Sequence, residues 1–181
     1  MRNHLLAVVV LYAVGLAVIW PPLRVQAQAV DEQRARDQLK SGLKFLDSNY
    51  LEALKDFRAV VELYPTSSVA DDALLQVATC ELEVAGNLGA AEQAVGDLLK
   101  NYSESDSAPM AYVLRGRIAV AKGRTKENFA TAVSNYQRVS SLHPRSDAVP
   151  AAIFYAGEAH RLNGNHNDAI AAYLKRHGRV G

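Results

Sequence analysis

Apolar residues recur every three or four positions along most of this chain, which is the spacing of one face of an α-helix. From about residue 31 onward the sequence shows no strand-like alternation of apolar and polar residues. The pattern predicts an all-α protein built from successive amphipathic helices. Short turns rich in glycine, proline and serine separate the predicted helices.

A five-residue motif, in which alanine is followed four positions later by a larger apolar residue, occurs four times. Its members are Ala53 with Phe57, Ala91 with Val95, Ala132 with Tyr136, and Ala169 with Tyr173. The two residues lie on one helix face, where the small alanine lets a neighbouring helix approach and the larger side chain fills the gap. One helix pair cannot bury such a stripe alone, so the repeat predicts several stacked pairs.

The turns between these helices carry their own signals. Pro65 and Pro144 follow the motif and end its helix, because proline lacks the N–H group and clashes with the preceding turn. Serines two residues further on predict N-caps for the next helix, at Ser67, Ser105 and Ser146. Glycines predict left-handed turns into the second helix of a pair, at Gly86, Gly123 and Gly164.

Gly116 and Gly157 lie in the middle of predicted helices, where glycine costs about 1 kcal/mol relative to alanine. This position predicts that the backbone of another helix packs against them.

Together these features resemble the tetratricopeptide repeat, whose signature is W-x2-L-G-x2-Y…A-x3-F…P. The fourth unit fits best, since Gly157 occupies the glycine position and Ala169 the later alanine position. The third unit has Arg115 where an apolar residue is expected and about four extra residues, 124–127, in its turn. The second unit has Ala78 in place of the glycine, and in the first unit Gly42 is out of step by one residue.

The resemblance covers about residues 31–175 and implies four antiparallel helix pairs stacked into a right-handed superhelix. Its units are roughly 31–66, 67–104, 105–145 and 146–181, the last of them incomplete. The residues expected to pack the repeats together are Ala53, Phe57, Pro65, Ala91, Val95, Gly116, Ala132, Tyr136, Pro144, Gly157, Ala169 and Tyr173.

The units are longer than the family's repeat of about 34 residues. Longer units with these junctions resemble the bacterial envelope branch of the family, which includes BamD of the outer-membrane assembly machinery and the cell-division coordinator CpoB. The chain lacks the lipid-accepting cysteine of BamD and the coiled coil of CpoB. The resemblance implies a non-enzymatic scaffold for protein partners in outer-membrane assembly or in envelope and division coordination.

The N-terminal segment supports export. Residues 5–20 carry no charge, Arg2 precedes them, and two small-residue processing motifs lie at 25–27 and 27–29. This pattern predicts a signal peptide over residues 1–29 and an exported, periplasmic or envelope-associated protein. The alternative is an uncleaved anchor, which would make the protein a membrane-tethered structural subunit, although sixteen residues fall short of the roughly 20 that span a bilayer. Cys80 lies far from this segment, so no lipid anchor is expected.

Composition excludes several classes of function. The chain has 181 residues, 20 Lys and Arg against 19 Asp and Glu, and 49% hydrophobic residues. The net charge of +1 argues against a nucleic-acid binder. This balance conceals a net charge of −8 over residues 30–107 and +7 over residues 108–181. In a solenoid this makes a dipolar rod, for which we expect salt-sensitive association with a partner or with itself.

Candidate chemical sites are sparse. One cysteine excludes a disulfide framework, and we expect Cys80 to be buried. His160, His166 and Asp168 do not provide enough well-spaced metal ligands. His166 occupies the slot held by Tyr50, Leu88 and Phe129 in the other units, which favours a packing role. Asp71 and Asp72 fall in a first helical turn, where carboxylates stabilise the helix N-terminus.

No phosphate-binding loop and no catalytic grouping appear in the sequence, so we expect no catalytic residue, no cofactor and no metal. The function falls instead to the concave face, which the first helix of each pair lines in the family. The residues expected there are Leu75, Thr79, Met110, Val113, Arg117, Phe154, Glu158 and Arg161. Leu75, Val113 and Phe154 are equally compatible with a core position. Because no capping helix follows the fourth unit, we expect either a partner at that end or a fragment of a larger protein with an accessory repeat domain.

Overall fold

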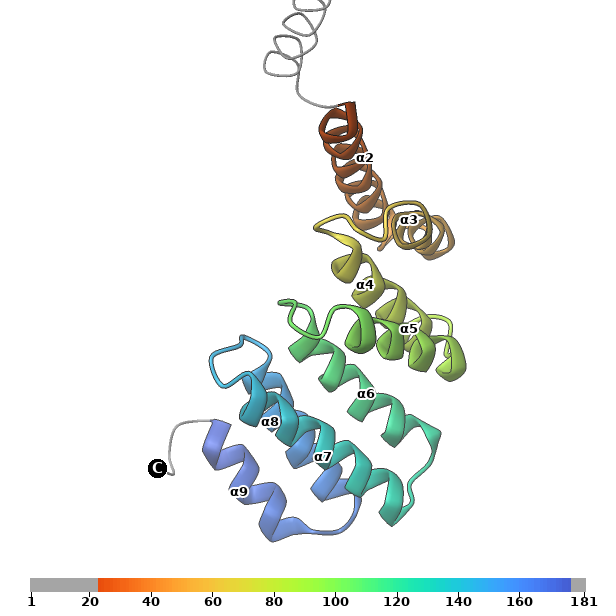
Figure 1. Ribbon diagram of the computed structural model, residues 1–181. Coiled ribbons are helices and arrows are strands. Elements are labelled where there is room, and N and C mark those ends of the chain that lie inside the picture. Colours follow the sequence, from red (N-terminus) through yellow and green to blue (C-terminus); the bar gives the residue numbers. More distant parts are fainter. Residues whose placement is uncertain (1–22, 177–181) are drawn as a thin grey trace, which may run out of the picture.

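The computed structural model describes residues 23–176, which form α-helices and no strands (Figure 1). The helices are α2 (Leu23–Phe45), α3 (Tyr50–Leu63), α4 (Ala70–Glu83), α5 (Leu88–Asn101), α6 (Ala108–Lys122), α7 (Lys126–Leu142), α8 (Val149–Leu162) and α9 (His166–Arg176). The predicted all-α class is confirmed. The predicted apolar segment, residues 5–20, lies outside the described residues.

The helices form an elongated array, with α2 at one end and α9 at the other (Figure 1). Consecutive helices pack in four pairs, and the second helix of each pair packs on the first helix of the next. The predicted four pairs are therefore present. Within residues 23–176, no helix combines the length and the apolar character that a membrane crossing requires.

The core is divided along the array. One cluster of buried side chains joins α3, α4, α5 and α6, and includes Phe57, Leu98 and Ile118. A second cluster joins α6, α7 and α8, and includes Phe129 and Tyr136. Helix α6 contributes side chains to both clusters.

The repeated alanine, at positions 53, 91, 132 and 169, is at most 3% exposed in all four units. Three mid-helix glycines each face the aromatic residue of their own unit. A Cβ atom on Gly42 would lie 2.5 Å from the ring of Phe57, and one on Gly157 would lie 2.6 Å from Tyr173. Gly116 faces Tyr136 in the same way. The expectation that a neighbouring backbone fills this space is wrong, because the ring of the paired helix occupies it.

In the second unit, two side chains of more similar size replace the glycine and the aromatic residue. Ala78 replaces the glycine and Val95 replaces the aromatic residue, and both are fully buried in one cluster. The larger side chain on the first helix is matched by a smaller one on the second. The total volume at the contact is therefore kept similar between units, which is what close packing requires.

The helix ends differ from the predicted caps. The second helices of the first three pairs begin at true side-chain caps: Asn49, Asn87 and Thr125 each accept a hydrogen bond from a backbone N–H three residues on. The predicted serines are not the N-caps of the first helices, which are Val69, Ser107 and Ala148, none with a side-chain cap bond. The hydroxyl groups of Ser67 and Ser105 have no hydrogen-bond partner among the described residues, whereas that of Ser146 accepts a bond from the backbone N–H of Ala148 at 3.1 Å.

Ser67 and Ser105 each lie one turn before their helix. The N–H of Ser67 donates to the carbonyl of Tyr64 at 3.0 Å, and the carbonyl of Ser67 accepts from the N–H of Ala70 at 3.3 Å. Ser105 makes the equivalent backbone bonds in the next unit. A backbone turn therefore leads into each of these helices.

Three further sequence expectations need correction. Pro65 and Pro144 are exposed and do not pack between repeats; each follows the residue that caps the end of α3 or α7. The extra residues of the third unit, 124–127, do not all lie in a turn: Lys126 and Glu127 begin α7, and Thr125 is its N-cap. Helix α7 accordingly has 17 residues against 14 in α3 and α5. Gly86 and Gly164 have the predicted left-handed turn, with φ angles of 65° and 80°, but Gly123 does not, because its φ of 152° and ψ of 156° lie outside the left-handed helical region.

Candidate protein-binding surface

One face of the array is formed by the first helices of the pairs. Helix α4 packs directly on α6, and α6 packs on α8, whereas no comparable contact joins α5 to α7 or α7 to α9 in the described chain. The first helices are therefore closer together than the second helices. This spacing curves the array so that α4, α6 and α8 share its inner side, which we call the first-helix face.

Three of the eight residues expected on the concave face meet at one pocket on the first-helix face. Arg117 of α6 and Phe154 and Glu158 of α8 line a space of 340 Å³. Tyr136, which the sequence predicted only as a packing residue, also lines this space. The other lining residues, none of which was predicted, are Val120, Ala121, Tyr155, Ala159 and Leu162.

The remaining five expected residues lie elsewhere. Val113 is 1% exposed and packs in the second core cluster, so of its two predicted positions it takes the one in the core and not the one on the binding face. Leu75 and Met110 are half-buried against the two core clusters. The hydroxyl of Thr79 donates to the carbonyl of Leu75 at 2.8 Å within its own helix. Arg161 is exposed at the rim of α8, beside Glu158.

The pocket has a charged wall and an aromatic wall. The guanidinium group of Arg117 lies 5.0 Å from the centroid of the Tyr155 ring and 2.5 Å from a carboxylate oxygen of Glu83 on α4. Phe154 meets Tyr155 edge to face, with 5.3 Å between ring centroids. Arg117 is held by contacts from two neighbouring helices, so its side chain is positioned before any ligand arrives.

Glu158 closes the other side of the pocket. It accepts hydrogen bonds from Arg161, at 2.7 Å, and from the hydroxyl of Tyr173 on α9. These bonds, that of Arg161 first, hold the pKa of Glu158 below its usual value. Burial and the bond to this carboxylate raise the pKa of Tyr173. At neutral pH the rim therefore carries an ionised carboxylate between an arginine and a neutral phenol.

Comparison with known proteins identifies the architecture. No protein-family model matches the chain, and no curated protein sequence matches it. One crystal structure of MamA protein is 18% identical with a TM-score of 0.62, covering 83% of this chain and 75% of that chain. A second crystal structure of MamA is 17% identical with a TM-score of 0.62, covering 85% of this chain and 82% of that one.

The fold is a tetratricopeptide-type helical repeat. At these identities the likeness concerns the fold alone. In this chain the space between the two helices of a pair is filled by the glycine and aromatic pairs described above. Tyr136 has two roles, because its ring packs on Gly116 and also lines the pocket.

The candidate metal residues in the fourth repeat do not assemble into a site. His160 Nδ1 lies 3.8 Å from a carboxylate oxygen of Asp168, which is an ion pair only when the histidine is protonated. The predicted packing role of His166 is wrong, because its side chain is exposed at the start of the last described helix. Phe129, at the equivalent position of the third repeat, is 3% exposed.

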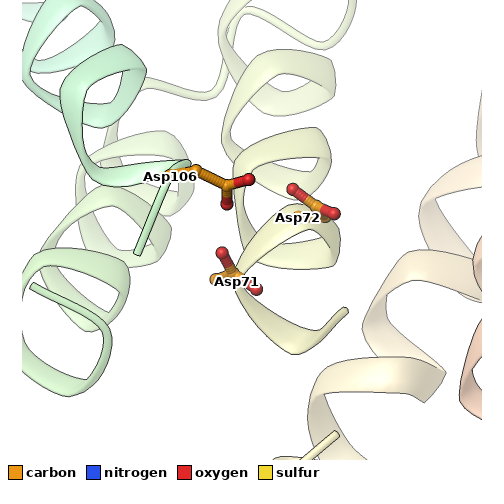
Figure 2. A group of neighbouring side chains, drawn as sticks. All are labelled: Asp71, Asp72 and Asp106. Carbon is orange, nitrogen blue, oxygen red and sulfur yellow. The ribbon is translucent and has the colours of Figure 1, made fainter. Parts of the chain in front are cut away.

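A carboxylate cluster lies instead at the junction of the second and third repeats (Figure 2). Asp71 and Asp72 start α4, as expected for acidic residues in a first helical turn. Asp106, in the turn before α6, brings a third carboxyl group to them, and one oxygen of each lies within 4.8 Å of the others. Sequence reasoning missed Asp106, because only the stacking of the two repeats brings it beside residues about 35 positions away.

Proposed function

We propose that this protein is a non-enzymatic scaffold or adaptor, which binds a protein partner on its first-helix face. The observation that supports the proposal is the pocket between α6 and α8, with Arg117 fixed over Tyr155 and Glu158 held ionised at the rim. Helical repeat proteins commonly bind their partners on extended concave surfaces of this type.

The pocket suits a segment of an extended peptide or a partner helix. An apolar side chain of the partner would enter between Phe154 and Leu162, where the walls are mostly apolar. Polar groups of the same segment would meet Arg117 and Glu158. Pre-positioned arginine and aromatic side chains supply most of the binding free energy in many protein interfaces.

Two variants on the same helix test the proposal. Arg117→Ala removes the charged wall of the pocket, whereas Arg115→Ala changes an arginine two residues away, which points to another side of α6. The immobilised protein is exposed to a bacterial envelope extract, and captured partners are quantified. We expect Arg117→Ala to reduce capture of a specific partner by about tenfold or more. Equal capture by both variants would contradict a partner at this pocket.

We further propose that the scaffold works in the bacterial cell envelope, in outer-membrane assembly or in the coordination of envelope and division processes. Support comes from the predicted signal segment and from the junction pattern of the repeats. Trp20 is the one tryptophan of the sequence, so its presence reports processing. An exported product without tryptophan fluorescence supports cleavage, whereas one that retains it supports the membrane-tethered alternative.

The charge distribution supports a salt-sensitive association. The half of the array formed by α2 to α5 is acidic and the half formed by α6 to α9 is basic, and they lie at opposite ends (Figure 1). We expect end-to-end or partner association that weakens as salt screens the charges. Light scattering at low and high salt measures it. An identical mass at both salt concentrations, with and without the partner, would argue against this association.

A further inference from the structure

The strongest unassigned feature of the molecule is the carboxylate cluster between the second and third repeats (Figure 2). Its three members come from two structural units: Asp71 and Asp72 from α4, and Asp106 from the turn before α6. Among the described residues, no lysine, arginine or histidine forms an ion pair with any of them. Three negative charges are thus collected at one point without a compensating cation from the chain.

Asp71 provides a second and independent observation. The residue is 7% exposed, and none of the hydrogen bonds or ion pairs found within residues 23–176 involves its carboxylate. Figure 2 shows one of its carboxylate oxygens directed at the space that it shares with Asp106. A buried carboxylate without a donor or a cation is strongly unfavourable, which is why buried charges in proteins are normally paired or coordinate metals.

The neighbouring groups add to this imbalance. Asp72 accepts one hydrogen bond from the hydroxyl of Ser107, at 2.7 Å. Despite that bond, burial and then the charges of Asp71 and Asp106 raise the pKa of Asp72. Asp106 is exposed, so an ion can reach the cluster from solvent.

We propose that Asp71, Asp72 and Asp106 bind a Ca²⁺ ion that joins the second repeat to the third. Calcium takes oxygen ligands at about 2.3–2.6 Å, so two ligands on opposite sides of it lie up to about 4.8 Å apart. Separations of up to 4.8 Å between these oxygens are therefore compatible with three carboxylates around one Ca²⁺ ion, and small side-chain movements complete the contacts. Magnesium, with bonds of about 2.0–2.1 Å, needs a tighter cluster and releases its water ligands reluctantly.

The binding of Ca²⁺ would act as a clamp between repeats. Asp71 and Asp72 belong to the first helix of one pair, and Asp106 to the approach to the next pair. Without the ion these carboxylates repel each other across the junction, and with it they attract a common charge. This proposal is independent of the partner pocket, because the cluster lies at the start of α4 and the pocket lies between α6 and α8.

The chain supplies a matched control. Asp147 follows Ser146 in the fourth repeat as Asp106 follows Ser105 in the third. At that junction the residues equivalent to Asp71 and Asp72 are Pro109 and Met110 of α6, so it has the loop aspartate without the other carboxylates.

The experiment uses the purified full chain after removal of metal with a chelator. Titration with CaCl₂ is followed by calorimetry and by thermal unfolding. We expect saturable binding of one ion with a dissociation constant of about 10⁻⁴ to 10⁻³ M. At about 10 mM CaCl₂ the midpoint of unfolding should rise by about 3–10 °C, and MgCl₂ should raise it less. NaCl at equal ionic strength controls for general screening of charge.

Two substitutions test the assignment. Asp71→Asn and Asp106→Asn should each abolish the Ca²⁺-dependent rise, while Asp147→Asn should keep it. Without calcium the first two variants should unfold at the same temperature as the wild type or higher, because each removes repulsion; this result separates lost binding from misfolding. The absence of a binding heat and of a calcium-dependent shift up to about 10 mM would overturn the proposal. So would an equal response of Asp106→Asn and Asp147→Asn.

Discussion

The contact between Gly116 and Tyr136 makes a sharp prediction about a single methyl group. In Gly116→Ala, the new Cβ atom would lie closer than 3.0 Å to each of the three nearest atoms of the Tyr136 ring. That ring cannot turn away freely, because it is 2% exposed and stacks on Tyr155 with 6.1 Å between centroids. The substitution therefore overfills the space between α6 and α7.

The magnitude follows from two opposing effects. Alanine is favoured over glycine within a helix by about 1 kcal/mol. Overpacking of a well-packed core costs about 1–3 kcal/mol, and the confined ring places this site at the upper end of that range. We expect Gly116→Ala to lower the free energy of unfolding by about 2 kcal/mol, which lowers the unfolding midpoint by about 4–8 °C.

Gly96 in α5 is the matched control, because it is also helical but has no atom within 4 Å of its added Cβ. Gly96→Ala should raise the free energy of unfolding by about 1 kcal/mol and the midpoint by about 2–4 °C. The same substitution should thus have opposite signs at the two positions. Thermal unfolding followed by circular dichroism measures both.

A second substitution tests the cause. Adding Tyr136→Val to Gly116→Ala reproduces the sizes of Ala78 and Val95 in the second repeat. The double variant should be less destabilised than the sum of the two single variants, by about 0.5–3 kcal/mol. Strictly additive effects, or a Gly116→Ala protein as stabilised as Gly96→Ala, would refute the packing argument.

Three further predictions concern other parts of the molecule. Cys80 is 1% exposed and burial raises the pKa of its thiol, so a colorimetric thiol reagent should react with it only as the protein unfolds. Hydrogen bonds from Ser68, then from Arg36, lower the pKa of Glu32 from 4.5 to about 2; this contribution is present above about pH 4.5 and is lost as the pH falls through 2. The midpoint difference between wild type and Ser68→Ala should therefore shrink from pH 7 to pH 2 in thermal unfolding. Removal of residues 1–29 should change the unfolding midpoint by less than about 2 °C, because residues 25–30 are all exposed; a larger fall would show that this part of α2 supports the fold.

Much of the fold was predictable, because every unit packs its helices in the same way and therefore needs the same kind of residue at the same position. The alanine at 53, 91, 132 and 169 must be small wherever two helices approach closely, so it recurs at a spacing that the sequence displays. The compensation between Ala78 and Val95 was harder to recognise. This pair keeps the volume of the contact similar although both residues differ from those of the other units, so a comparison based on residue identity does not detect it.

The candidate site was less predictable than the fold, for two physical reasons. Neighbouring positions on a helix differ by about 100° in direction, so an error of one residue moves a side chain between the core and the open face; Val113 is such a case. The carboxylate cluster depends on how one repeat stacks on the next. Nothing in the sequence around Asp71 or around Asp106 indicates that the two residues lie side by side.

The helix starts show a related limit. A serine before a helix suggests a side-chain cap, but Ser67 and Ser105 contribute backbone bonds to a preceding turn. The asparagine and threonine caps of the second helices follow the ordinary preference for short polar side chains at this position, but they are not part of the repeated proline and serine pattern and were not predicted.

The position of α6 between the two larger core clusters has a consequence for how the protein unfolds. Leu114 and Ile118 pack in the first cluster, whereas Val113 and Ala119 of the same helix pack in the second. Cooperativity along the array therefore passes through one helix. As long as α6 is intact, the two halves should unfold in a single transition. A lesion that breaks α6 should separate them into two, with the slowest hydrogen exchange of each half retained in its own cluster.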